Sequence, residues 1–308
     1  MLTDGFFCGE GFYLAFINFR RLITMNDVTQ DLLKHLTLER LEENIYRGDS
    51  RDVGSPNVYG GQVLGQALFA ASQTVEGREA HSLHAYFLRP GNKNEPVVYE
   101  VDRIRDGRSY TVRRIVAIQR GKPIFNMSAS FKIKEKGIEH QIEMPEVSCP
   151  EDLLNTTELG KQALADSPEK LSRFLKWQRP VEFRPIQPTD ILHPDPAPPF
   201  RDIWIKADGA LPNDPAMHKV LFAYTSDYSL LGTALLPHAL TFTQGTIRAA
   251  SLDHAMWFHR DFRMDEWLLY SMDSPSTSHG RGFGRGNLFT REGKLVASVA
   301  QEGMIRKI

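Results

Sequence analysis

The feature that most constrains how this chain folds is an internal repeat. Four segments of the first half recur in the second half in the same order. At separations of 167, 170, 171 and 172 residues, the matching pairs are 60–68 with 227–235, 84–90 with 254–260, 95–100 with 266–271, and 121–125 with 293–297. One short match would be chance, but four matches at a nearly constant offset predict that the chain consists of two related halves.

Each half is predicted to contain a short strand, an apolar helix and then a run of long strands. The expected helix at 61–75 carries almost no charge, which is typical of a helix that is buried on most sides. Strands rich in Val, Ile, Tyr and Phe are expected at 81–88, 97–105, 109–119 and 123–134. The second half is expected to form a helix at 228–237 and strands at 247–258, 267–274, 280–290 and 295–305.

An uncharged helix followed by a meander of long strands is best buried when the sheet curls around the helix. This is the hotdog arrangement, and two copies in one chain predict an α+β fold, the double hotdog. Pairing the halves edge to edge into one continuous sheet would also cover exposed strand edges. We expect an N-terminal hotdog at 25–135, a linker at 136–200, and a C-terminal hotdog at 201–308 that carries the candidate catalytic residues.

The linker and the N-terminus differ in composition from the two halves. Residues 150–176 have a helical pattern, and seven of the 18 prolines lie between 180 and 199, which indicates a stiff, extended connector.

Residues 1–24 are apolar but interrupted by polar residues, with neither the flanks of a signal peptide nor the length of a membrane span. They form either a loose interfacial segment or, as we favour, a non-native or disordered extension before a true start at Met25.

The overall composition narrows the classes of partner and the cellular setting. With 37 basic and 38 acidic residues the net charge is −1, which argues against nucleic acid as the main partner. The two cysteines, Cys8 and Cys149, show no metal-ligand spacing, and no disulfide framework is expected. A reducing, cytoplasmic setting fits this composition best.

Positions that differ in polarity between the halves are candidates for chemistry. The repeat pairs Asp227, at the start of the expected second helix, with Gly60, and it pairs Gln301 in the last strand with Ala129. Ser251 stands at the start of the first long strand, aligned with Ala80 or Ser82 depending on where the gap is placed. In a hotdog pair the helix starts and the middle strands meet across the groove between the halves, so these three polar side chains could converge. The alternative for an Asp at a helix start is an ordinary N-cap.

Four longer segments, 59–68, 81–91, 252–260 and 299–303, resemble the acyl-CoA thioesterase II family, whose members are double-hotdog enzymes. The resemblance covers about 37–306. It implies hydrolysis of acyl-CoA to fatty acid and CoA without a cofactor or a metal. It also implies a catalytic set made of an Asp at the second helix, a Ser or Thr two residues before an Asp-His pair, and a Gln in the last strand. In this chain those positions are Asp227, Ser251 and Gln301.

The implied mechanism is attack of an activated water on the thioester carbonyl. Asp227 would accept the proton of this water or orient it, while Ser251 and Gln301 would hold the water by hydrogen bonds. Backbone N–H groups at a helix start, at Gly60 and Gly61, could stabilise the oxyanion of the tetrahedral intermediate.

Two further roles in the second half have alternative interpretations. In a rival mechanism Ser251 would be the nucleophile, but His254 lies three residues on in the expected strand and should face the opposite side of the sheet. We therefore expect His254 to be a packed histidine. The glycine-rich run 281–286 is either a twisted strand entry or a place where Arg281 or Arg285 contacts a phosphate of CoA.

Two other functions compete with hydrolysis. A hotdog dehydratase or hydratase needs a His base paired with Asp or Glu at the helix, and neither helix start offers this pair. A non-catalytic acyl-CoA-binding hotdog is the main alternative, although such a protein gains little from a desolvated carboxylate at Asp227. We expect an acyl-CoA substrate, no nucleic acid, no stable membrane insertion, and a homo-oligomer that is a dimer or a tetramer.

Overall fold

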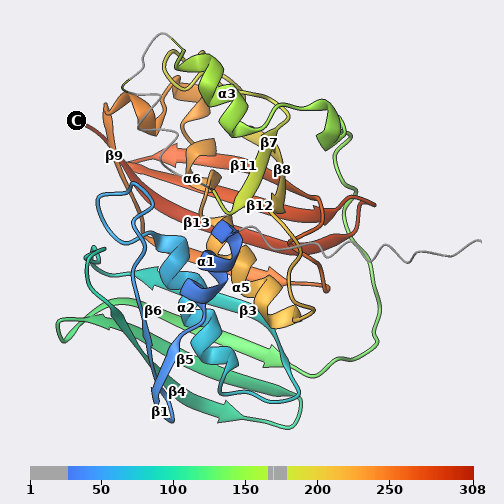
Figure 1. Cartoon of the computed structure of the whole chain (residues 1–308). Helices are drawn as coiled ribbons and strands as arrows, with labels where there is room; N and C mark the ends of the chain where they lie inside the picture. The colour runs from blue at the N-terminus through green and yellow to red at the C-terminus, as the bar shows by residue number, and fades with distance from the viewer. Residues whose placement is uncertain (1–26, 166–168, 170–178) are drawn as a thin grey trace, which may run out of the picture.

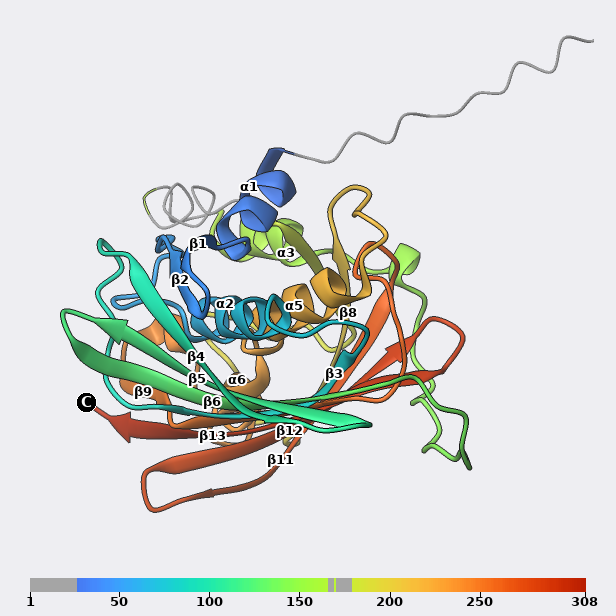
Figure 2. The ribbon, with the colours of Figure 1, turned by 90° about the horizontal axis from the view of Figure 1, so that it is seen from below.

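A computed structural model describes residues 27–165, 169 and 179–308 of the chain. The predicted extension at 1–24 lies outside these residues, as does part of the helix expected at 150–176. One antiparallel sheet of 13 strands wraps around two central helices, α2 (Gly60–Ser72) and α5 (Pro215–Ser226), one from each half (Figures 1 and 2). The fold is therefore the expected double hotdog.

The first half starts with helix α1 (Asp27–Leu36), and its strands lie in the order β1-β2-β4-β5-β6-β3. Their bounds are β1 (Glu39–Glu42), β2 (Ile45–Gly48), β3 (Glu79–Phe87), β4 (Val97–Asp106), β5 (Tyr110–Gln119) and β6 (Lys122–Lys132). The ends of the four long strands lie within two residues of their predicted positions. The alternation of apolar residues in these strands was therefore a reliable guide to their bounds.

From the junction outward, the second half continues as β10-β13-β12-β11-β8-β7, which is the order of the first half in reverse, and β9 pairs with the last part of β13. Its strands are β7 (Val181–Pro185), β8 (Phe200–Ala207), β9 (Ile247–Ser251), β10 (Asp253–Phe258), β11 (Leu268–Ser278), β12 (Arg281–Thr290) and β13 (Leu295–Lys307). The shorter helical elements are α3 (Thr156–Ala163), α6 (Leu230–Thr233), and 3-10 turns at Pro150–Asp152, Leu236–His238 and Phe242–Gln244.

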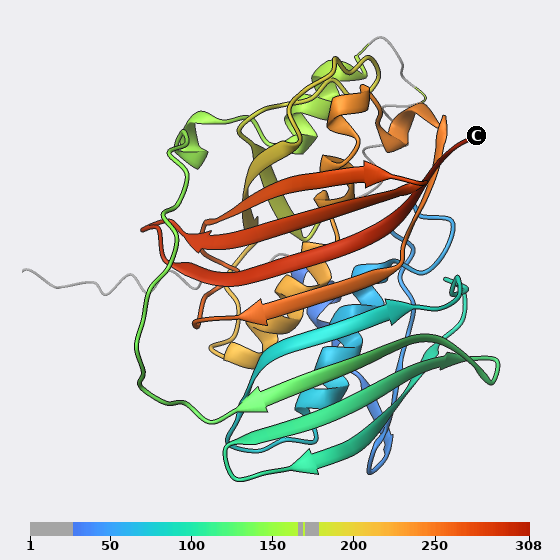
Figure 3. The same cartoon turned by 180° about the vertical axis from the view of Figure 1, so that it is seen from behind.

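The two halves join through β3 and β10, the neighbouring strands at the middle of the sheet (Figure 3). Across this junction His84 pairs with Ala255 and Ala85 pairs with His254. In the repeat, His254 is the counterpart of His84 and Ala255 is the counterpart of Ala85. Each histidine therefore pairs with the alanine of the other half, and the junction is symmetric. The sheet passes through the junction without an unpaired edge, which confirms the expected edge-to-edge pairing.

The second central helix lies upstream of its predicted position. We expected it at 228–237, but α5 ends at Ser226, and only α6 and a 3-10 turn lie in the expected range. α5 begins after Asp214, whose side chain accepts the Ala216 N–H at 3.0 Å, and Pro215 is its first residue. An Asp N-cap followed by a proline is a strong helix start, which the repeat alignment concealed.

The proline-rich stretch is more than a connector. β7 lies inside the range that we predicted as linker, and it pairs with β8 as the outermost strand of the second half. Residues 133–149 do form an irregular connection, which leads along the outside of the molecule from β6 to the second half (Figure 3). The chain therefore needs an extended linker, but a shorter one than predicted.

Helices α2 and α5 pack against each other in antiparallel directions. A Cβ at Gly61 would meet the carbonyl oxygen of Tyr224, whereas a Cβ at Gly65, one turn later, would lie 3.2 Å from the carbonyl oxygen of Val220. Eleven of the 13 residues of α2 are buried, as its uncharged sequence predicted. The lack of a side chain at Gly65 therefore sets how closely the two helices approach.

We predict that Gly65→Val separates the two helices and destabilises the protein. Overpacking a tight contact should lower the free energy of unfolding by about 1–3 kcal/mol, measured by urea denaturation. Gly137→Val is the matched control, because a Cβ at Gly137 meets nothing within 4 Å. Its effect should stay within about 0.5 kcal/mol. Equal stabilities of the two variants would show that the helix contact is not tight.

Candidate active site

Asp227 lies where the C-terminus of α5 meets the N-terminus of α2. It directly follows α5, and its Oδ2 accepts the Gly61 N–H at 2.9 Å. A Cβ at Gly60 would come within 2.7 Å of the same oxygen, and one at Gly61 would collide with the carbonyl oxygen of Tyr224. Both positions therefore require glycine. The prediction that Asp227 starts a helix was wrong: it follows one helix and faces the start of another.

Ser251 and Gln301 contact the same carboxylate. Gln301 Nε2 donates to Asp227 Oδ1 at 2.6 Å and to Ser251 Oγ at 2.9 Å. Ser251 Oγ in turn donates to Asp227 Oδ1 at 3.3 Å. The three side chains come from the end of α5, from β9 and from β13, and they form a closed triangle of hydrogen bonds. The structure thus brings together the three residues that the sequence comparison selected.

A one-residue β-bulge between β9 and β10 turns Ser251 toward this carboxylate. Ser251 pairs with Gly303 and Ala255 pairs with Ala300. The chain from Ser251 to Ala255 therefore advances by four residues while β13 advances by three, which leaves one extra residue. Such a bulge interrupts the alternation of side chains between the two faces of a sheet. Ser251 and His254 consequently both face the interior, which corrects the prediction that they face opposite sides.

His254 supports the end of α5 and does not contact Ser251. Its Nε2 lies 3.0 Å from the Oγ of Ser226, the residue before Asp227, and its side chain is completely buried. Its Nδ1 has no hydrogen-bond partner among the residues that the structure describes. Burial lowers the pKa of His254 to about 4, against the opposing effect of the Asp227 charge. The imidazole is therefore neutral at pH 7.

The carboxylate of Asp227 has a nearly complete set of hydrogen-bond donors. Gly61, Ser251 and Gln301 supply three hydrogen bonds, and a carboxylate offers about four acceptor sites. The N-terminus of α2 favours the negative charge, whereas the C-terminus of α5 opposes it. Because Oδ1 accepts two of the bonds and Oδ2 accepts one, the remaining acceptor site is on Oδ2.

Three tyrosines surround the junction of the two helices. The ring of Tyr59 lies 5.2 Å from that of Tyr224 and 4.7 Å from that of Tyr228, and the hydroxyls of Tyr224 and Tyr228 are 3.0 Å apart. Burial raises the pKa of all three phenols, and the charge of Asp227 adds to this effect at Tyr59. Sequence reasoning missed this cluster, although Tyr59 directly precedes the glycine pair.

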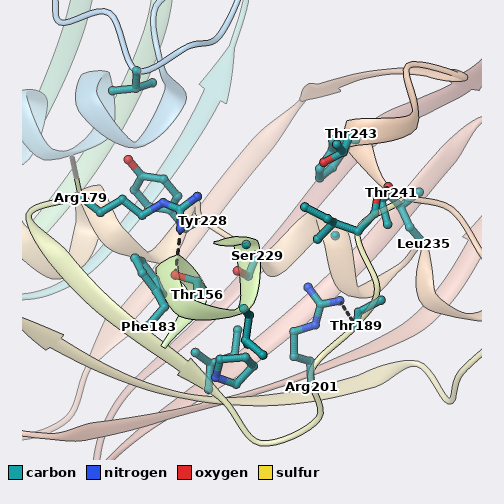
Figure 4. A pocket seen from close by; sticks show the side chains of 18 of the residues that line it. Thr156, Arg179, Phe183, Thr189, Arg201, Tyr228, Ser229, Leu235, Thr241 and Thr243 are labelled. Atoms are coloured by element: carbon teal, nitrogen blue, oxygen red, sulfur yellow. Dashed lines mark hydrogen bonds between the residues drawn. The ribbon is translucent and has the colours of Figure 1, made fainter. Parts of the chain in front are cut away.

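A cavity of about 660 Å³ opens beside Tyr228 and Ser229, the two residues that follow Asp227 (Figure 4). Its volume lies in the range of small-molecule sites, about 300–1,000 Å³. Apolar side chains form much of the wall; they include Leu159, Phe183, Ile203, Leu235, Leu240 and Phe242. The cavity therefore offers room for part of a substrate beside the two residues that follow the candidate base, although Asp227 itself does not line it.

Arg281 and Arg285 lie away from this group. Along β12 they alternate with buried glycines, and one of these, Gly284, is the partner of Gln301 on β13. The two arginines therefore project from the opposite face of the sheet to Gln301. Each forms an ion pair with a carboxylate of a neighbouring strand. Their predicted contact with a CoA phosphate gains no support from this geometry.

Residues 27–165, 169 and 179–308 contain neither a metal-binding cluster nor a membrane-spanning helix. No group of three or more His, Cys, Asp or Glu side chains there is arranged to hold a metal ion. No helix in this part of the chain has the length and apolar character needed to cross a membrane. Cys149 is exposed and free, and Cys8 lies outside the described residues.

The chain matches two family models and several known proteins. Residues 47–132 match the model "Acyl-CoA thioesterase N-terminal domain", and residues 175–304 match the model "Acyl-CoA thioesterase". A Haemophilus influenzae protein named acyl-CoA thioesterase 2 is 38% identical, with 92% of this chain and 99% of that protein covered. Human acyl-coenzyme A thioesterase 8 is 41% identical, with coverage of 88% and 87%.

A solved structure agrees with this assignment. The acyl-CoA thioesterase II TesB2 of Mycobacterium marinum matches with a TM-score of 0.74 and 40% identity, covering 90% of this chain and 98% of that one. Sequence and fold thus agree over almost the whole length of these relatives, and the chain belongs to the acyl-CoA thioesterase family.

Proposed function

We propose that this protein hydrolyses acyl-CoA thioesters to a free fatty acid and CoA, with Asp227 as the general base for the attacking water. The main support is the geometry of Asp227, whose carboxylate is held between the two hotdogs by donors from three elements. Membership of the acyl-CoA thioesterase family supports the choice of substrate class.

In the first step a water donates a proton to Asp227 while its oxygen attacks the thioester carbonyl carbon. The proton goes to Oδ2, because Oδ1 already accepts hydrogen bonds from Ser251 and Gln301. These two side chains orient the carboxylate through Oδ1 and leave Oδ2 to the water. A base held in this way needs no reorganisation when the water attacks.

The tetrahedral intermediate needs a hydrogen-bond donor for its oxyanion. Of the two predicted donors, the Gly61 N–H already binds Asp227, whereas the Gly60 N–H has no acceptor in the described part of the chain. Gly60 also lies beside Oδ2 at the positive end of α2. We therefore assign oxyanion stabilisation to Gly60. Collapse of the intermediate breaks the C–S bond, and the proton on Asp227 passes to the leaving thiolate.

Asp227→Asn should lower kcat by about 10²–10⁴-fold, because the amide cannot accept the proton of the water. The measurement is release of free thiol from a panel of acyl-CoAs. Asp214→Asn is the control: it changes the same residue type at the other end of α5, where asparagine also caps a helix. Full activity of Asp227→Asn would exclude the general-base role. A wild type that releases no thiol from any acyl-CoA would support the acyl-CoA-binding alternative.

Ser251→Ala should reduce turnover by about 10–100-fold without abolishing it, because the change removes one hydrogen bond to a charged group. Ser251→Thr keeps the hydroxyl and should remain close to wild type. A nucleophilic Ser251 would need a base: His254 is bonded to Ser226 instead, and in the proposed mechanism Asp227 takes the proton of the water. Single-turnover mass spectrometry should therefore find no acyl group on Ser251, and capture of such an adduct would overturn the direct-water mechanism.

The stability of the protein should fall on acidification because of His254. Burial lowers its pKa from 6.5 to about 4, so between these pH values the unfolded chain binds one proton more than the native protein. This difference destabilises the native state at low pH by up to roughly 3 kcal/mol. His254→Gln should therefore show a smaller drop in the free energy of unfolding between about pH 7 and pH 4.5.

The exposed His84 provides the control for this comparison, since His84→Gln should keep the full pH dependence of the wild type. Urea denaturation at both pH values measures the difference. An unchanged pH dependence in His254→Gln would contradict a buried, neutral imidazole at this position.

A further inference from the structure

The cavity beside Tyr228 carries more positive than negative charge on its walls. Its charged lining residues are Arg51, Arg179, Arg201 and Asp52. The carboxylate of Asp52 is already paired with Lys93 at 2.9 Å, and Arg51 is paired with Asp31 at 3.3 Å, so Arg51 adds little free charge to the wall. A largely apolar cavity with positive charge left on its walls suits a ligand that carries an anionic group.

Arg201 projects from the inner face of β8. Side chains alternate along a strand, so Arg201 shares its face with Ile203 and Ile205, which belong to the hydrophobic core. Figure 4 shows its guanidinium group within the cavity, where Nη2 donates to the Thr189 Oγ1 at 3.3 Å. An arginine on an apolar strand face was visible in the sequence, but sequence reasoning did not select it.

The charge of Arg201 has no counter-ion among the residues that the structure describes. It forms no ion pair with a carboxylate of the described ranges, and burial alone lowers its pKa. The adjacent Asp202 faces the other side of the sheet with Trp204. Of the five N–H donors of a guanidinium, one has a recorded acceptor here. The side chain is partly buried, and a partly desolvated charge without a counter-ion favours a ligand that supplies the opposite charge.

We propose that Arg201 binds an anionic oxygen group of the acyl-CoA substrate: a phosphate of the CoA part or a carboxylate at the far end of the acyl part. The inference rests on the proposed thioesterase activity. The planar guanidinium can bind either group through two parallel hydrogen bonds. Gly232 leaves one side of it uncovered, since a Cβ there would lie 3.7 Å from Nη1.

The position of the cavity relates this anion site to the candidate base. The cavity wall includes Tyr228 and Ser229, next to Asp227, as well as Arg201 on β8 (Figure 4). Asp227 itself does not line the cavity, so a substrate with its thioester at Asp227 would reach Arg201 by way of Tyr228 and Ser229. Arg179, which donates to Thr156 at 2.8 Å, adds a second positive charge to the same wall.

Three thioesters distinguish the two sources of the anion: octanoyl-CoA, octanoyl-pantetheine, which lacks phosphates, and octanedioyl-CoA, which has a second carboxylate. If Arg201 binds a phosphate, Arg201→Gln should lower kcat/KM about 10–100-fold for both CoA esters and leave the pantetheine ester unchanged. If it binds the terminal carboxylate, a loss of this size should occur only with octanedioyl-CoA. Equal losses with all three substrates, or no loss with any, would overturn the proposal.

Arg47→Gln is the matched control for this comparison. Arg47 lies on β2, the counterpart of β8 in the first half, where it is exposed and paired with Glu39 at 3.4 Å. This variant should match the wild type on every substrate. Arg201→Lys keeps the charge without the planar group and should lie between the wild type and Arg201→Gln, so it provides a second test if the glutamine variant does not fold.

The outcomes also separate this inference from the proposed function. An Asp227→Asn variant with full activity would refute the catalytic assignment and leave the Arg201 comparison valid. Calorimetric titration of CoA and of octanedioate into wild type and Arg201→Gln repeats the comparison without turnover. About tenfold weaker binding of one of these ligands to Arg201→Gln is expected, and unchanged affinity for both would refute the anion site.

Discussion

The candidate site depends on one interaction, the hydrogen bond between the N-terminus of α2 and the carboxylate of Asp227. Tyr59, the N-cap residue of α2, makes no side-chain cap, so the Gly61 N–H would otherwise remain unpaired. The carboxylate that caps it comes from the other half of the chain. Each half therefore supplies what the other lacks: one provides the helix start with its glycines, and the other provides the acid.

The continuous sheet holds the remaining groups in place. β3 and β10 join the halves, and the bulge between β9 and β10 directs Ser251 to the face that also carries Gln301. Behind Asp227, the buried His254 bonds to Ser226 and fixes the last turn of α5. Groups carried by helix ends and strands within a packed core are positioned more precisely than groups on loops.

The two halves are alike in topology but not in chemistry. At the other end of the helix pair, α5 starts with its own N-cap, Asp214, and α2 ends at Ser72 and is followed by Gln73. Ala129 stands in the first half at the position that corresponds to Gln301. Within the described residues, the polar group around Asp227 therefore forms at one end of the helix pair only. The pseudo-symmetry of the fold does not extend to the site.

The sequence by itself determined the paired architecture. The repeat at a nearly constant offset predicts two related halves, and the alternation of apolar residues, which reflects local preferences and burial, predicts their strands. It also selected Asp227, Ser251 and Gln301, since polarity that differs between two related halves is visible without coordinates. It misplaced the second helix because the match at 227–235 depended on residue type, whereas the helix start depended on Asp214 and its capping bond.

Only the tertiary structure decided which ends of the helices meet, which face Ser251 and His254 share, and which arginine lacks a counter-ion. The first depends on the antiparallel packing of α2 and α5, whose residues are about 150 positions apart in the chain. The second depends on a backbone bulge that no side-chain pattern records. The third depends on whether a described carboxylate forms an ion pair with Arg201, which is a property of contacts between distant segments and not of any local stretch of sequence.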